Sequence, residues 1–192
     1  SRSLGMEFAT AAFHNSYYFH KDDNVITNKE EVCGDFEKLI NLQLKEKHPK
    51  SWMRAFFNMG LINYIEGSRR MLPCQAGEMN FFVEPYGDIY PCNGLEKKYW
   101  KKSIGNIRET PNFKEIWEGK QAEQVRQMVR RCPKNCWMVG TASPVMHKYI
   151  KYPLKWALKN KLRSLQGKTA CLDKCWYNVG QDPSQGDLRD VF

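Results

Sequence analysis

Residues 74–92, with the sequence CQAGEMNFFVEPYGDIYPC, carry the clearest structural signal in this chain. Two short runs of β-forming residues, FFVE and DIY, flank a Pro-Tyr-Gly segment at residues 85–87. Proline fixes φ at the start of a turn, and glycine accepts a positive φ at its end. The pattern therefore predicts a β-hairpin. Because the chain returns antiparallel to itself, we expect Cys74 and Cys92 to lie at the same end of the ribbon.

A second cysteine pair follows the hairpin. Cys132 and Cys136 are separated by three residues and come just after a predicted helix, 121–131. This spacing lets both sulfurs face one ion or cluster, so the two pairs together predict a four-thiolate site. Four thiolates suit either a structural Zn²⁺ or a [4Fe–4S] cluster, and spacing alone leaves both open. Buried free thiols are the usual interpretation of one or two cysteines rather than of four.

The cysteines belong to a longer pattern that resembles the auxiliary-cluster domain of radical SAM enzymes. That domain has a Cys, a variable spacer, a Gly, four residues and a Cys, which residues 74–92 match with Gly87 in the glycine position. A SIGNIR turn at 103–108, an FKEIW helix at 113–117 and the CPKNCW run at 132–137 follow in the same order. The resemblance implies one [4Fe–4S] cluster, with the ligands Cys74, Cys92, Cys132 and Cys136.

Two departures from the family limit what the resemblance implies. The larger version of the domain, SPASM, has seven cysteines and two clusters, whereas this chain has only the final C-x3-C before Trp137, so the one-cluster twitch version is the closer match. The C-x3-C-x2-C motif that holds the SAM-cleaving cluster is absent, because the required third cysteine is replaced by Val139 or Asn178. We therefore expect S-adenosylmethionine to bind only in a full-length enzyme, and this chain alone not to be a catalyst.

In the family, the auxiliary cluster closes the open side of the catalytic barrel. The implied roles are to accept or relay an electron or to shape the substrate pocket, and the implied partner is a missing N-terminal radical SAM barrel. The alternative from another class is a zinc-stabilised four-cysteine binding module without a redox role.

The whole chain reads as an α+β protein. A strand-like run at 6–13, a helix from Asn28 to Pro49 and a helix from Ser51 to Gly67 resemble the tail of a partial (β/α) barrel. The expected division is 1–72 for this barrel remnant, 73–142 for the auxiliary cluster domain with its hairpin and two helices near 111–117 and 121–131, and 143–192 for a C-terminal helix and tail.

Most of the net charge of +9 comes from one segment. Residues 147–168 contain seven Lys and Arg and no Asp or Glu, and they predict a basic amphipathic helix at 148–166. One side of it has five aliphatic residues: Ile150, Leu154, Leu158, Leu162 and Leu165. Three interpretations stay open: a solvated face, peripheral contact with an anionic membrane, or attraction of a phosphorylated or lipid-linked substrate. Nucleic-acid binding is not expected, because no reading motif accompanies the charge.

The remaining cysteines and the histidines give weaker signals. Cys171 and Cys175 repeat the C-x3-C-Trp pattern and are either a further ligand pair, a replacement for one proposed above, or spare thiols. Cys33 is interpreted as a core residue. Trp137 and Trp176 are interpreted as packing that dries a cluster, and the four histidines as surface or loop residues: His14, His20, His48 and His147.

The chain has no apolar run of about 18 residues and no signal-peptide layout at its start. Its odd number of cysteines also argues against a secreted disulfide scaffold. We therefore expect a cytoplasmic protein.

Overall fold

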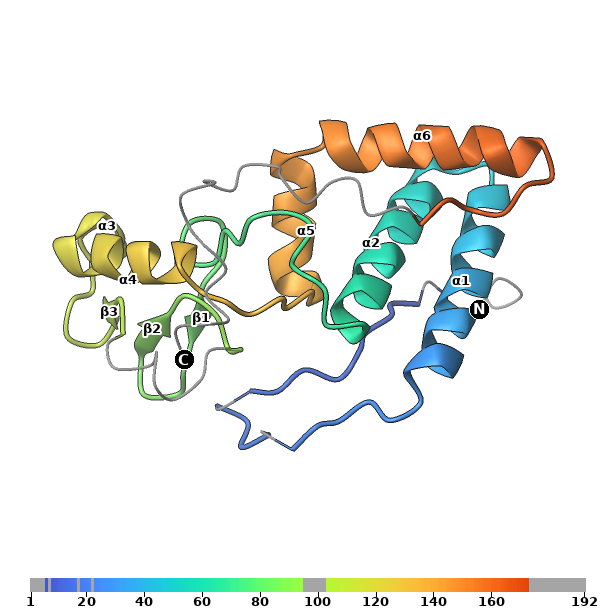
Figure 1. Ribbon diagram of the computed structural model, residues 1–192. Helices are drawn as coiled ribbons and strands as arrows, with labels where there is room; N and C mark the ends of the chain where they lie inside the picture. Colours follow the sequence, from blue (N-terminus) through green and yellow to red (C-terminus); the bar gives the residue numbers. More distant parts are fainter. Residues whose placement is uncertain (1–5, 7, 17, 22, 95–102, 173–192) are drawn as a thin grey trace.

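The computed structural model describes residues 6, 8–16, 18–21, 23–94 and 103–172. Two groups of elements lie side by side, a helical group and a smaller group built on a sheet (Figure 1). In chain order the elements are α1 (Lys29–Lys45), α2 (Pro49–Ile65), β1 (Phe82–Val83), β2 (Asp88–Tyr90), β3 (Gly105–Asn106), α3 (Phe113–Glu118), α4 (Lys120–Arg130), α5 (Val139–Lys148) and α6 (Lys151–Leu165).

The helical group contains the larger core. Ile40 and Leu44 of α1 pack against Phe56 and Leu61 of α2, and α6 covers them with Trp156. All five side chains are almost fully buried. Burying each stabilises the fold by about 1.5–3 kcal/mol relative to leaving it exposed. This core combines residues from the start and the end of the chain, so it spans the expected division at 72 and 143.

The predicted helices are confirmed, with differences at their ends, and α1 ends at Lys45 rather than at Pro49. Asn28, where the first helix is predicted to start, lies at the N-cap of α1, and its side chain donates to Glu31 rather than capping a backbone group. The second helix begins at Pro49, two residues before the predicted start at Ser51. Proline fits the first helical position because its missing N–H would have no partner there. Gly67 ends this helix with φ +76°, as predicted.

The predicted strand at 6–13 is wrong. The described residues in this range form no strand, and Phe8 and Phe13 are exposed. The segment instead runs along α2, where Thr10 donates to Asn58 at 2.5 Å and Tyr64 donates to the carbonyl oxygen of Phe13 at 2.8 Å. A β-forming sequence needs a neighbouring strand to satisfy its backbone groups, and no described residue pairs with this run.

The predicted hairpin is confirmed. β1 and β2 pair antiparallel with Phe82 opposite Tyr90, and Gly87 in the turn has φ +94°. The sequence prediction did not include β3, which pairs antiparallel with β2 and makes this a three-stranded sheet. α3 and α4 cover the sheet and form a second small core with it, containing Ile89, Ile104, Ile116, Ala122 and Val125.

Two helices close the described chain. α5 is not predicted, because Gly140 and Pro144 interrupt its helical pattern, but it buries Val145 and three neighbouring side chains. α6 corresponds to the predicted basic helix, with Pro153 in its first turn. None of the described helices combines the length and the apolar character that crossing a bilayer requires.

Candidate metal centre

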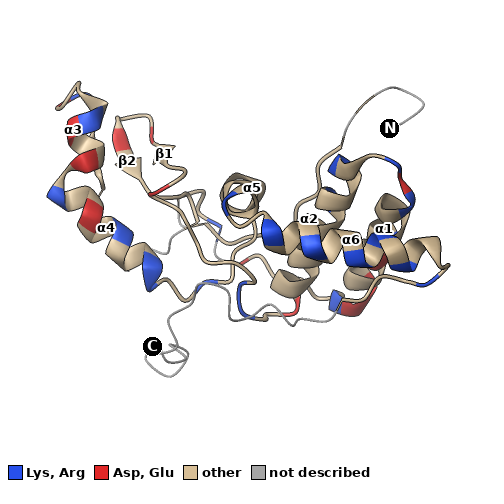
Figure 2. Ribbon diagram, turned by 90° about the horizontal axis from the view of Figure 1, so that it is seen from above, with Lys and Arg blue, Asp and Glu red and all other residues tan. Residues whose placement is uncertain are grey.

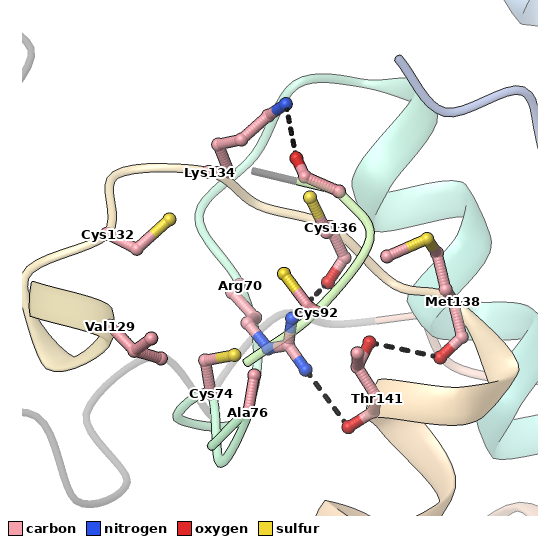
Figure 3. A pocket seen from close by; sticks show the side chains of 11 residues that line it. Arg70, Cys74, Ala76, Cys92, Val129, Cys132, Lys134, Cys136, Met138 and Thr141 are labelled. Atoms are coloured by element: carbon pink, nitrogen blue, oxygen red, sulfur yellow. Dashed lines mark hydrogen bonds between the residues drawn. The ribbon is translucent and has the colours of Figure 1, made fainter. Parts of the chain in front are cut away.

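Four cysteines from three separate segments line one pocket between the helical group and the sheet group. They are Cys74, Cys92, Cys132 and Cys136, the four residues that the sequence singles out. Their sulfurs point toward a common space (Figure 3). The remaining lining is largely apolar, with Ala76, Val129 and Met138. None of the four cysteines forms a disulfide.

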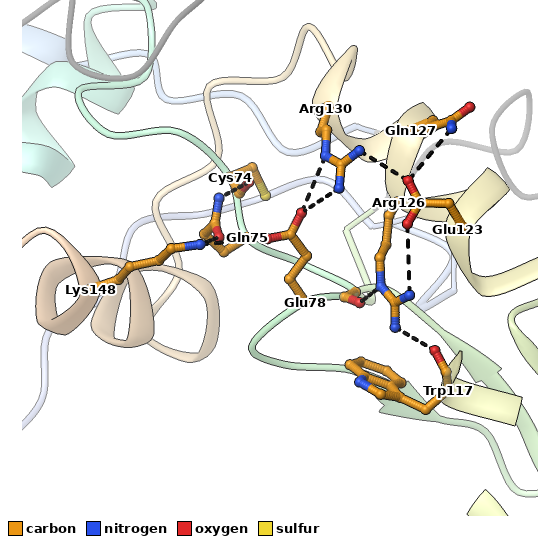
Figure 4. A network of polar contacts seen from close by, with 10 residues as sticks. Cys74, Gln75, Glu78, Trp117, Glu123, Arg126, Gln127, Arg130 and Lys148 are labelled. Atoms are coloured by element: carbon orange, nitrogen blue, oxygen red, sulfur yellow. Dashed lines mark hydrogen bonds and ion pairs between the residues drawn. The ribbon is translucent and has the colours of Figure 1, made fainter. Parts of the chain in front are cut away.

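Helix α4 holds the segment that carries Cys74. Arg126 donates from Nε to the carbonyl oxygen of Gly77 at 2.8 Å, and its Nη2 donates to the carbonyl oxygen of Trp117 at 2.6 Å (Figure 4). One turn later, Arg130 donates from Nη2 to Glu78 at 3.1 Å. The loop after Cys74 is therefore tied to the helix whose end leads into Cys132.

The C-x3-C loop is fixed at both ends. The backbone N–H of Cys132 donates to the carbonyl oxygen of Val129 at 3.0 Å, at the last turn of α4. Asn135 donates from Nδ2 to the carbonyl oxygens of Tyr64 and Ser68, at 3.2 and 3.0 Å. These bonds hold the loop between α4 and the end of α2, so the spacing of the two cysteines is set by both groups of elements.

The residue after Cys136 anchors the pocket in the helical core. Trp137 is 1% exposed, and its Nε1 donates to the carbonyl oxygen of Phe57 at 2.8 Å. Its ring lies so close to Gly60 that a Cβ there would come within 2.1 Å of it. Trp137 has a packing role, as predicted. It packs in the helical core, however, and is not among the residues that line the pocket.

Two cations line the pocket, and the sequence prediction did not include them. Arg70 is 6% exposed and donates to the carbonyl oxygens of Leu72, Cys136 and Thr141. Lys134 donates to the carbonyl oxygen of Gly94 at 2.9 Å. Lys134 could have been noticed because it stands inside the C-x3-C motif, whereas Arg70 has no periodic or motif signal.

Burial sets the protonation of the thiols. It raises the pKa of Cys92 to about 12 and that of Cys132 to about 11, and the neighbouring cysteines add to both shifts. Burial also raises the pKa of Cys136, while Lys134 and Arg70 act in the opposite direction. The thiol forms of Cys92, Cys132 and Cys136 are therefore favoured at neutral pH, and metal binding would release their protons.

The four sulfurs line one pocket, and the spacing that each metal requires differs. Within the described ranges, no group of three His, Cys, Asp or Glu side chains forms a site for one metal ion. Zn–S bonds of about 2.3 Å require tetrahedral sulfurs within about 4 Å of one another. A cluster of several irons accepts thiolates that stand further apart.

The other predicted residues lie elsewhere. Cys171 is not among the residues that line the pocket. It lies beside α6, where its backbone N–H donates to Asn160 at 2.6 Å. Cys175 and Trp176 fall outside the described residues. Cys33 is partly buried against the helical core, in line with its prediction as a core residue.

The four histidines are predicted to be surface or loop residues, and His14 lies in a loop segment but is partly buried. Its ring stacks on Tyr64 with the centroids 3.9 Å apart. Nδ1 donates to the carbonyl oxygen of Ala12 at 2.8 Å, and Nε2 accepts from the backbone N–H of Trp137 at 3.0 Å. Burial lowers the pKa of His14. The three other histidines are exposed: His20, His48 and His147.

One comparison with known proteins gives a match. Residues 74–138 match the family SPASM, described as an iron-sulfur cluster-binding domain. The matched range contains Cys74, Cys92, Cys132 and Cys136 and none of the other cysteines. Neither the curated proteins nor the solved structures gave a match. The match supports iron–sulfur binding and does not favour the zinc alternative.

Proposed function

We propose that Cys74, Cys92, Cys132 and Cys136 hold one [4Fe–4S] cluster and that this chain is the auxiliary-cluster portion of a radical SAM enzyme. The observation that carries the proposal is the convergence of four sulfurs, from three segments of an iron–sulfur domain, on one pocket. The radical SAM context rests on the sequence resemblance.

The charges around the pocket support a cluster. A [4Fe–4S] core with four thiolates has a net negative charge, which is costly to bury without nearby cations. Arg70 and Lys134 line the same pocket and provide two positive charges. The lining also contains the apolar residues Ala76, Val129 and Met138, and a low local polarity strengthens attraction between opposite charges.

A bound cluster would accept or relay an electron, or help to shape a substrate pocket. Four cysteine ligands leave no iron open, so these two roles fit better than direct binding of substrate. The proposed partner is a radical SAM barrel that binds S-adenosylmethionine, and the residues that choose the substrate belong to that barrel.

Metal analysis of the anaerobically reconstituted chain tests the proposal. We expect about four irons and four sulfides per chain, with broad absorbance near ~400 nm. Serine at Cys74, Cys92, Cys132 or Cys136 should remove most of this absorbance. Cys33→Ser and Cys171→Ser are matched controls, because these cysteines lie outside the pocket, and both should retain the iron of the parent chain.

Three outcomes would contradict the proposal. A chain that takes up one zinc and no iron would establish the binding-module alternative. Full iron content in all four pocket variants would show that the ligands are wrong. Loss of iron in Cys171→Ser, with folding intact by circular dichroism, would place that cysteine among the ligands.

A further inference from the structure

Helix α6 exposes an apolar ridge, defined here as Ile150, Leu154, Leu158, Leu162 and Leu165. These residues recur every three or four positions and therefore lie along one strip of the helix. All five are exposed, with fractions from 43% to 71%. The strip extends about 22 Å at 1.5 Å per residue.

The ridge is not the face that holds α6 to the protein. The buried residues of the helix are Pro153, Trp156, Ala157 and Asn160, which lie on another side of it. Trp156 and Ala157 belong to the helical core. Lys161 also anchors the helix, because its Nζ donates to the carbonyl oxygens of Leu44 and Glu46 at 2.8 Å. The ridge is therefore extra apolar surface that folding of the described residues does not need.

Positive charge borders the ridge. At 100° per residue, Lys151, Lys155 and Lys159 fall on the outer flank beside the leucines, and all three are exposed. The chain has no Asp or Glu between Glu123 and Asp173. Figure 2 shows blue positions along α6 and no red ones, whereas α3 and α4 carry both colours.

We propose that α6 is a membrane-surface anchor that lies in the plane of an anionic bilayer. The aliphatic ridge enters the boundary between headgroups and acyl chains, while the lysines contact anionic headgroups. The combination favours lipid over a protein partner, because the ridge has only aliphatic side chains and none of the Trp, Tyr or Arg residues that dominate protein interfaces. The proposal is independent of the cluster function.

Vesicle sedimentation with the full chain tests the anchor. We expect the protein to pellet with vesicles of phosphatidylcholine and phosphatidylglycerol but not with phosphatidylcholine alone. Binding to the anionic vesicles should weaken at least tenfold between 50 and about 500 mM salt, since the Debye length falls from roughly 14 to 4 Å.

Two sets of variants separate the ridge from the charge. Leu158→Asp with Leu162→Asp should abolish pelleting, whereas Leu42→Asp, at an exposed leucine of α1, should not. Gln at Lys151, Lys155 and Lys159 should weaken binding to anionic vesicles at least fivefold. Gln at Lys29, Lys47 and Lys120, which removes the same charge outside α6, should have little effect.

Circular dichroism and the thermal midpoint verify that each variant is folded, and the lysine set tests the anchor even if the aspartates destabilise α6. Failure to bind anionic vesicles would overturn the proposal, as would pelleting that is unchanged in both α6 variants. A wild-type dimer that the ridge aspartates convert to monomer, without any lipid binding, would assign the ridge to a second copy of this chain instead.

Discussion

Arg70 is a buried cation that lines the cysteine pocket. Its guanidinium is buried, donates to three carbonyl oxygens and lies 5.6 Å from the ring centroid of Trp137. A fixed positive charge beside a cluster stabilises the added electron, and low local polarity increases the effect.

The Arg70→Gln variant should therefore lower the reduction potential of the bound cluster. Redox titration followed by electron paramagnetic resonance measures it. Arg70→Lys keeps the charge and should stay closer to the parent potential, and Arg69→Gln, at an exposed neighbour, should leave it unchanged. Equal potentials in Arg70→Gln and the parent chain would show that Arg70 acts only through its hydrogen bonds.

His14 joins the N-terminal segment to the residue after Cys136. Burial lowers its pKa below the usual 6.5, and a protonated ring could no longer accept the N–H of Trp137. As the pH falls below about 6.5, the unfolded chain binds a proton at this position before the folded chain does, so the free energy of unfolding decreases.

His14→Gln should reduce this loss of stability in acid. Urea unfolding at pH 7, 6 and 5 measures it as the change in free energy of unfolding with pH. The matched control is His147→Gln at the exposed end of α5, which should follow the parent chain. A parent-like pH dependence in His14→Gln would remove His14 as the cause.

At the scale of elements, the contact between α2 and Trp137 joins the cysteine loop to the helical core. Trp137 lies over Gly60 because α2 has no side chain at that position. The contact depends on this glycine for space rather than for a special backbone angle, since Gly60 lies inside the helix.

Gly60→Ala should lower the free energy of unfolding by about 1–3 kcal/mol, because the new methyl group overlaps the indole ring of Trp137. Gly34→Ala in α1 is the control: nothing lies within 4 Å of its Cβ position, and alanine should stabilise that helix by about 0.5–1 kcal/mol. Urea unfolding measures both. An unchanged midpoint in Gly60→Ala would mean that Trp137 moves aside at little cost.

At the scale of the whole molecule, the cysteine pocket lies where the two groups of elements meet. Arg70, which lines the pocket, follows helix α2, and Cys74 and Cys92 lie at the two ends of the hairpin segment. The C-x3-C loop belongs to the connection between α4 and α5. A cluster at this position would therefore stabilise both groups together.

The loaded chain should not cleave S-adenosylmethionine, because its sequence has no C-x3-C-x2-C motif to leave an iron open. The assay is 5′-deoxyadenosine formation under dithionite, with a radical SAM enzyme measured in parallel as a positive control. Product above the level without protein would contradict this expectation.

Local patterns in the chain were enough to predict the hairpin, α1, α2, α6 and the two separate cysteine pairs, whereas bringing the two pairs together depends on tertiary packing. Each of these depends on residues near one another in sequence: Pro and Gly in a turn, apolar residues at helical spacing, or two cysteines brought together by one hairpin. Whether the four cysteines ligate a cluster stays a prediction.

Other features depend on contacts between distant segments, which no local pattern contains. Residues 6–13 are predicted as a strand, but a strand forms only where a partner strand is available. β3 has two residues, and α5 contains Pro144, so pairing and burial outweigh their local preferences. The aliphatic pattern of α6 predicts a helix, but the side that packs is set by Trp156, because its large ring fills the space over α1 and α2.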